Sequence, residues 1–116
     1  MRFANTQELK QLVEEEEGLL TCTMEQLREM AGAGRLGVHV RDKISKTLAG
    51  SGLGHFPHGL PTYQHEEVRI YRLGSPMEDI VNAIVHPSGG GDQKLRDAVN
   101  ANQQEILDQV RALVCD

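Results

Sequence analysis

Three histidines lie close together in the sequence, and their type and spacing could hold a metal ion. His55, His58 and His65 form the pattern H-x2-H-x6-H. A zinc site needs about four ligands, and its histidines are usually joined by cysteine or carboxylate groups. Here the neighbouring Glu66 or Glu67, or the distant Cys22, would have to complete the set. Because loop histidines are far more often plain polar residues, we expect no metal and no other cofactor.

The remaining reactive side chains do not form a familiar catalytic motif. Ser51 lies in Gly-Ser-Gly, whereas a hydrolase nucleophile turn has the pattern G-x-S-x-G. Gly50, Gly52 and Gly54 follow a predicted helix instead of a strand, and no Gly-Lys-Ser/Thr sequence accompanies them. They are therefore more typical of a helix end than of a phosphate-binding loop. We expect a protein that is not an enzyme.

The basic residues between positions 28 and 46 form a local cluster in an acidic chain. The cluster contains Arg28, Arg35, Arg41, Lys43 and Lys46, against Glu29 and Asp42. The whole chain carries a formal net charge of −5. Because phosphate binding is short-ranged in cellular salt, a local cluster is a candidate nucleic-acid site even on an acidic protein. The alternative is that these charges only solvate the outer face of an ordinary helix.

A predicted pair of helices positions these charges. Thr23 is a suitable N-cap for a first helix over residues 24–31, and Gly32–Gly34 then interrupts the apolar pattern. The pattern resumes in a helix over residues 35–49, whose apolar side chains recur every fourth residue: Leu36, Val40, Ile44 and Leu48. Two helices joined by a short glycine turn are the sequence signature of a helix-turn-helix.

A helical wheel separates the charged side chains of the second helix from its apolar stripe. The side chains that point away from the core are Arg35, Val38, His39, Asp42, Ser45 and Lys46, with Arg41 and Lys43 on the flanks. The wheel thus predicts an outward face with several cations and one carboxylate, Asp42.

Further elements flank this pair. A helix is predicted over residues 6–17, capped by Thr6, and residues 54–73 read as a two-stranded wing. In that wing, residues 67–73 alternate as a strand does, and residues 54–56 supply a short partner strand. Pro76 suits the first position of a helix that extends to position 85.

The C-terminal part reads as a linker and a final helix. Residues 88–91 are Gly-rich, which predicts a flexible linker between a domain at 1–87 and an amphipathic helix at 92–116. The apolar stripe of that helix contains Leu95, Val99, Ile106, Val110 and Leu113, and Asn102 interrupts it. The helix either folds back onto the domain or pairs with a second copy, where an Asn could fix the register.

Composition sets the remaining limits. A chain of 116 residues makes one small core, and 3% aromatic residues without Trp make that core aliphatic. Cys22 and Cys115 have no metal or disulfide spacing, and no apolar segment is long enough to span a membrane. We expect a cytoplasmic protein with no membrane partner, either complete or cut from a larger chain.

The order of helices, glycine turn and strand resembles the winged helix-turn-helix superfamily over about residues 6–86. The residues that carry the resemblance are Leu27, Gly32, Arg35, Leu36, Val40, Ile44 and Leu48, followed by the strand at 68–71. The resemblance implies a mainly α domain with a small β wing and an additional C-terminal helix. In that superfamily the second helix of the pair commonly enters the major groove, and the wing commonly contacts phosphate.

The resemblance implies duplex DNA as the partner and transcription regulation as the role. Its DNA-binding residues would be Arg35, His39, Arg41, Lys43 and Lys46, with Arg69 and Arg72 on the wing. Asp42 in the middle of that face and the negative net charge are departures from the pattern. Because winged helices also dock proteins, the alternative is a protein–protein interaction or adaptor module. The helix at 92–116 would allow a homodimer in either case.

Overall fold

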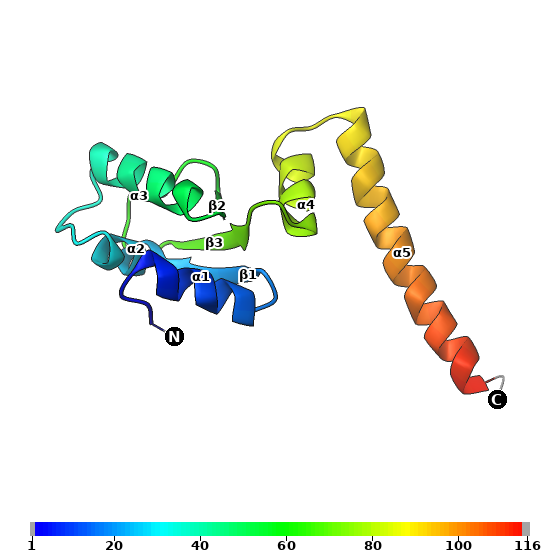
Figure 1. Ribbon diagram of the computed structural model, residues 1–116. Helices are drawn as coiled ribbons and strands as arrows, with labels where there is room; N and C mark the ends of the chain where they lie inside the picture. Colours follow the sequence, from blue (N-terminus) through cyan, green and yellow to red (C-terminus); the bar gives the residue numbers. More distant parts are fainter. Residues whose placement is uncertain (1, 115–116) are drawn as a thin grey trace. The chain divides into compact units, whose positions relative to one another are not determined.

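The computed structural model describes residues 2–114 and combines helices with a small three-stranded antiparallel sheet, a mixed α/β arrangement (Figure 1). The elements are α1 (Thr6–Glu15), β1 (Leu19–Thr23), α2 (Met24–Met30), α3 (Val38–Gly50), β2 (Leu53–Phe56), β3 (Glu67–Arg72), α4 (Pro76–Val85) and α5 (Gly89–Val114). The chain divides into two compact units, Met1–Glu78 and Asp79–Asp116, and each is described by itself.

The sheet of the first unit has the order β1-β3-β2, with both neighbours antiparallel to β3. The β2–β3 hairpin occupies the region predicted as a wing, and its short partner strand is present. The sequence did not predict β1, which adds a third strand by pairing Leu20 with Ile70 and Cys22 with Val68. Only two side chains of β1 are buried, so its apolar pattern is too short to distinguish a strand from a connection.

One face of the sheet and three helices share a single aliphatic core. Each helix contributes side chains that are fully buried: Leu9 and Val13 from α1, Met24 and Leu27 from α2, and Ile44 and Leu48 from α3. The strands contribute Leu20, Cys22, Leu53, Val68 and Ile70 to the same cluster. The predicted apolar stripe of the long helix therefore does face the core.

The two helices of the predicted pair begin differently. Thr23 caps α2 as predicted: its hydroxyl accepts a hydrogen bond from the Gln26 amide, and the Gln26 side chain accepts one from the Thr23 amide. Gly32 adopts a φ of +69°, a conformation that costs Gly little. The second helix, however, begins at Val38 with Gly37 as its N-cap, three residues later than predicted. Arg35 consequently lies in the connection before the helix.

The other helix starts also differ in detail from the sequence prediction. Asn5, not Thr6, caps α1, because its side chain accepts from the Glu8 amide. Residues 89–91, predicted as a flexible linker, form the first turn of α5, where the Ser88 hydroxyl accepts from the Gly91 amide. In the part of the chain described, no helix is both long and apolar enough to span a bilayer.

The outer face of the sheet carries Tyr71, whose ring lies over Gly54. The two residues are direct partners in the β2–β3 register, so their side-chain positions are on the same face. A Cβ atom on Gly54 would lie 2.5 Å from Cζ of the Tyr71 ring. Glycine is therefore needed at position 54, because the Tyr71 ring occupies the space of a side chain there. Burial also raises the pKa of the Tyr71 hydroxyl, and the negative charge of Glu78 raises it further.

Cys22 lies inside the core and is chemically quiet. Only 4% of its surface is exposed, and this burial raises the pKa of the thiol to about 12. Because the thiolate is the reactive form, the side chain acts as a small apolar residue near neutral pH. Cys115 lies outside the described residues.

Candidate nucleic-acid interface

The outward face of α3 carries the side chains that the sequence assigned to it. His39, Asp42, Lys43 and Lys46 are exposed, whereas Ile44 and Leu48 on the opposite side are buried. His39 and Lys46 are seven residues apart, which is about 10 Å along a helix. The first turn of α3 contains no acidic residue. The face is therefore a short basic ridge with one carboxylate on it.

That carboxylate is paired within the helix. Asp42 Oδ2 lies 3.0 Å from Lys46 Nζ, and the acidic residue precedes the basic one by four positions. This order is the favourable one along a helix, although an exposed pair of this kind adds little stability. The pair does reduce the repulsion that Asp42 alone would exert on an approaching phosphate.

Arg35 lies beside this ridge, in a connection that another arginine stabilises. Arg28 Nη1 donates a 2.8 Å hydrogen bond to the Ala33 carbonyl, and its Nη2 lies 3.9 Å from Glu29. Arg28 thus holds the turn between α2 and α3, while Arg35 is exposed. The positive charge available to a partner comes from Arg35, Lys43 and Lys46.

Arg41, which the prediction assigned to the DNA-binding set, makes a contact within the protein. Its side chain is half-buried, and Nη1 donates to the Leu60 carbonyl over 3.4 Å. Leu60 itself is buried in the core cluster. Arg41 therefore contacts the loop between β2 and β3, and the geometry gives it a structural contact instead of an exposed position on the ridge.

The loop at 57–66 is also held at its other end. The amides of Met24 and Glu25 donate to the carbonyls of Glu66 and Gln64, each over 3.0 Å. These bonds satisfy donors at the start of α2 that the helix itself leaves unpaired. The loop of the predicted wing thus folds against α2 and α3. The sequence offers no signal for this, since the bonded residues are about forty positions apart.

The wing arginines do not share a face. The alternating burial of β3 places Arg69 opposite to Val68 and Ile70, on the outer side of the sheet. Arg72 lies on the core side at the strand end, paired with Leu53 just after α3. Both arginines are exposed. Since α3 packs on the core side, the structure brings Arg72 toward the end of α3 and separates Arg69 from it.

Among the three clustered histidines, His55 forms side-chain hydrogen bonds to other parts of the first unit. His55 Nε2 lies 2.9 Å from the Ser45 hydroxyl of α3, and its Nδ1 lies 2.9 Å from the Pro57 carbonyl. Because a carbonyl only accepts, Nδ1 carries the proton of that bond. His65 stacks on Tyr63, with ring centroids 5.9 Å apart. Among the described residues, no group of three His, Cys, Asp or Glu side chains is arranged to hold a metal ion.

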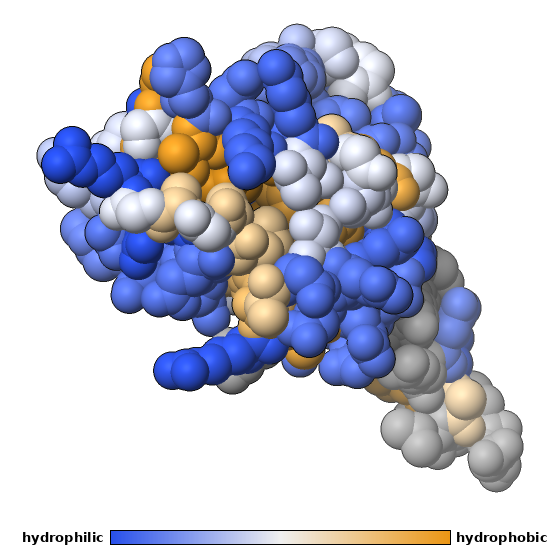
Figure 2. Space-filling view, turned by 60° about the vertical axis from the view of Figure 1, so that its left-hand side comes forward, coloured by the Kyte–Doolittle hydropathy of each residue, from blue (hydrophilic) through white to orange (hydrophobic). Residues whose placement is uncertain are grey.

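Apolar side chains also reach the surface near α3. Val38, the first residue of the helix, is 65% exposed, and Leu36 and Val40 are half-buried against the core. Figure 2 brings the side of α2 and the α2–α3 connection forward and shows apolar surface between hydrophilic side chains. The start of α3 therefore exposes an apolar side chain, Val38, next to polar groups.

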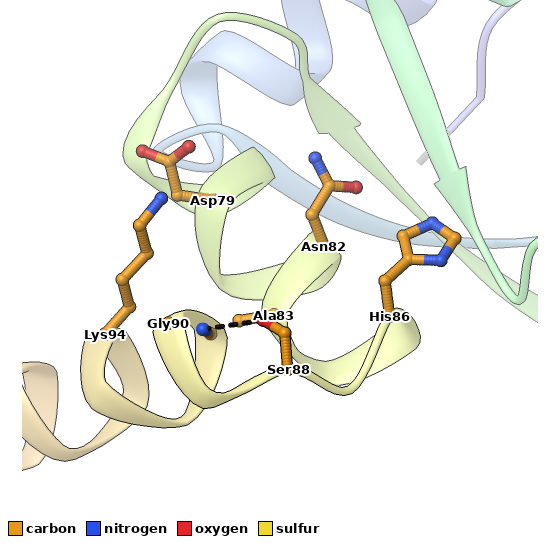
Figure 3. A pocket seen from close by; sticks show the side chains of 8 residues that line it. Asp79, Asn82, Ala83, His86, Ser88, Gly90 and Lys94 are labelled. Atoms are coloured by element: carbon orange, nitrogen blue, oxygen red, sulfur yellow. Dashed lines mark hydrogen bonds between the residues drawn. The ribbon is translucent and has the colours of Figure 1, made fainter.

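A hollow of about 360 Å³ lies in the second unit, between α4 and the first turns of α5. Asp79 and Lys94 point toward each other across one side of it, while Asn82 and His86 lie on the other side (Figure 3). The hollow is open to solvent and most of its lining residues are exposed, so it lacks the enclosure typical of small-molecule sites.

The long helix α5 exposes part of its predicted apolar stripe. Val99 and Val110 are exposed, as is Leu107, and Leu95 is half-buried. The side chains of Ile106 and Leu113, which also belong to the stripe, and of Asn102, which interrupts it, are not described by the structure.

Comparison with known proteins adds no relative: no family model, curated protein or solved structure matches this chain.

Proposed function

We propose that the first unit is a winged helix-turn-helix domain that binds duplex DNA through the outward face of α3. The element order α1-β1-α2-α3-β2-β3 supports this proposal, as does the antiparallel hairpin that follows the second helix of the pair. The proposal assigns transcription regulation as the role of the protein.

The observation that carries the proposal is the charge on α3. Exposed Arg35, Lys43 and Lys46 lie in or next to one helix of a chain whose net charge is −5. The Asp42–Lys46 pair leaves this surface positive overall. A lysine or arginine on such a ridge neutralises a phosphate and releases counterions, which is the main source of affinity for DNA.

The shape of α3 fits the same use. A single exposed helix matches the width of the major groove, and a helix-turn-helix contacts base edges with the first residues of its second helix. Val38 and His39 occupy those positions here. Lys43 and Lys46 then lie further along the helix, within reach of the backbone. Arg72 would add a contact at the other end of α3, whereas Arg41 and Arg69 take no part in the proposal.

Titration of labelled duplex DNA at two salt concentrations tests the proposal. We expect an Arg35→Ala/Lys46→Ala variant to bind more weakly and to lower the slope of log K against log[salt] by about two, one for each lost contact. The matched control is Lys94→Ala/Arg96→Ala, which removes the same charge from exposed positions of α5 in the second unit. Equal slopes for the two variants would show that binding does not use α3, and no binding at low salt would exclude the function.

One observation favours a protein partner as the second candidate. Val38 and Tyr63 are each 65% exposed, and the wing loop is folded down against α2 and α3 instead of projecting. Exposed aromatic and aliphatic side chains with few charges are typical of protein interfaces. A chain that fails to bind duplex at low salt would be assigned to this adaptor role.

The helix α5 supports a homodimer as part of the same proposal. Its exposed valines at 99 and 110 would be buried by pairing with a second copy, which would place two α3 helices on one duplex. Sedimentation of the full chain and of a Val99→Lys/Val110→Lys variant tests the pairing. We expect a dimer that the variant converts to a monomer, and a monomeric parent chain would remove the assembly role.

A further inference from the structure

Two side chains on the first turns of α3 offer chemistry that phosphate binding does not use. Val38 and Asp42 are four residues apart, so their side chains are neighbours on one side of the helix. Val38 is 65% exposed and the Asp42 side chain is 62% exposed. An apolar group gains nothing from a phosphate, and a carboxylate repels it. If α3 binds DNA, these two residues face something other than the backbone.

We propose that Val38 and Asp42 select pyrimidines in the major groove: Val38 contacts the C5-methyl group of thymine, and Asp42 accepts a hydrogen bond from N4 of cytosine. This inference rests on the proposed binding of duplex DNA by α3 and names the bases that the same site reads.

The assignment of Val38 follows from what base pairs display. Thymine presents its C5-methyl group in the major groove, and this is the apolar group among the four ordinary base edges. The branched side chain of Val38 stands at the first position of α3, where a helix-turn-helix reaches the bases. Burying it against a methyl group removes apolar surface of both partners from water.

The assignment of Asp42 follows from charge. An ionised carboxylate only accepts hydrogen bonds, so it is repelled by the acceptors of guanine and by O4 of thymine. The donors in the groove are N4 of cytosine and N6 of adenine, and adenine places its N7 acceptor beside N6. Cytosine is therefore the preferred partner. Lys46 Nζ lies 3.0 Å from Oδ2, and the exposed carboxylate has a second oxygen that can accept a hydrogen bond.

The spacing of the two residues predicts the spacing of the two bases. Four residues of helix rise about 6 Å, and base pairs are separated by about 3.4 Å along the duplex. The thymine and the cytosine should consequently lie one or two base pairs apart.

The first test measures base preference. A pool of duplexes with a randomised centre is selected with the full chain, and the best duplex is then compared with versions that carry adenine in place of the cytosine. We expect the parent protein to prefer cytosine by about tenfold. An Asp42→Asn variant should reverse the preference, because asparagine pairs with N6 and N7 of adenine. Glu14→Gln, which removes a carboxylate from an exposed position of α1, should leave it unchanged.

The second test isolates the methyl group. Replacing the selected thymine by deoxyuridine removes only the C5-methyl and should lower the affinity of the parent protein about fourfold, the effect of one buried methyl. The same replacement should change nothing for Val38→Ala. The ratio of the two affinities cancels any general change in binding that a variant causes.

The outcomes separate the two levels of the proposal. Duplex binding without base preference, or an Asp42→Asn variant that keeps a cytosine preference, would overturn the readout and leave DNA binding in place. A methyl effect that persists in Val38→Ala would overturn the role of Val38. If no duplex binds at low salt, DNA binding itself fails and the readout with it.

Discussion

Replacing Ile44 by alanine should lower the free energy of unfolding by about 2–5 kcal/mol, as for other large-to-small changes in a packed core. Ile44 is 1% exposed and lies in the cluster that joins α3 to the sheet. The change removes most of an aliphatic side chain and leaves a cavity that the surrounding strands cannot fully close. Chemical denaturation followed by circular dichroism measures the difference.

Thr47→Ala provides the control for this prediction. Thr47 is exposed on the same helix, so its truncation should change stability by no more than about 0.5 kcal/mol. A loss of that small size for Ile44→Ala would mean that α3 does not present Ile44 to the core. The outward face on which the DNA proposal depends would then be wrongly assigned as well.

The features that could be predicted from the sequence are those set by local periodicity and caps. Apolar side chains at intervals of four residues indicate the inward side of a helix, and the buried Ile44 and Leu48 of α3 confirm it, although Leu36 lies before the helix begins. The capping role of Thr23 is similarly local, because its partner Gln26 is three residues away. The exposed positions of His39, Lys43 and Lys46 follow from the same wheel.

The features that could not be predicted depend on contacts between distant residues. The strand β1 is recognisable only once its partner β3, nearly fifty residues away, lies beside it. Arg41 appears as one more cation on a helix until the Leu60 carbonyl is placed next to it. Which wing arginine lies nearer to α3 likewise depends on a contact between strands, the pairing of Arg72 with Leu53 of β2.

The second large effect is expected at Gly54. Replacing it by alanine should destabilise the protein when Tyr71 is present and stabilise it when the Tyr71 ring is removed. Gly54→Ala should destabilise the protein by about 1–3 kcal/mol, the usual cost of overpacking, because the new Cβ would lie 2.5 Å from Cζ of the Tyr71 ring. The ring must turn away from its buried position, where its relative exposure is 4%. The backbone itself does not oppose the change, since Gly54 is not among the residues with positive φ.

A double-mutant cycle shows whether the ring is the cause. A Tyr71→Ala background removes the three atoms nearest to the new Cβ, and an alanine in a strand is more stable than glycine by about 0.5–1 kcal/mol. Gly54→Ala should therefore stabilise that background. Gly50→Ala is the matched control, because no atom lies within 4 Å of its new Cβ and it should not destabilise the protein. If Gly54→Ala were equally destabilising with and without the tyrosine ring, the ring would not be what requires glycine, and the packing of β2 against β3 would need another explanation.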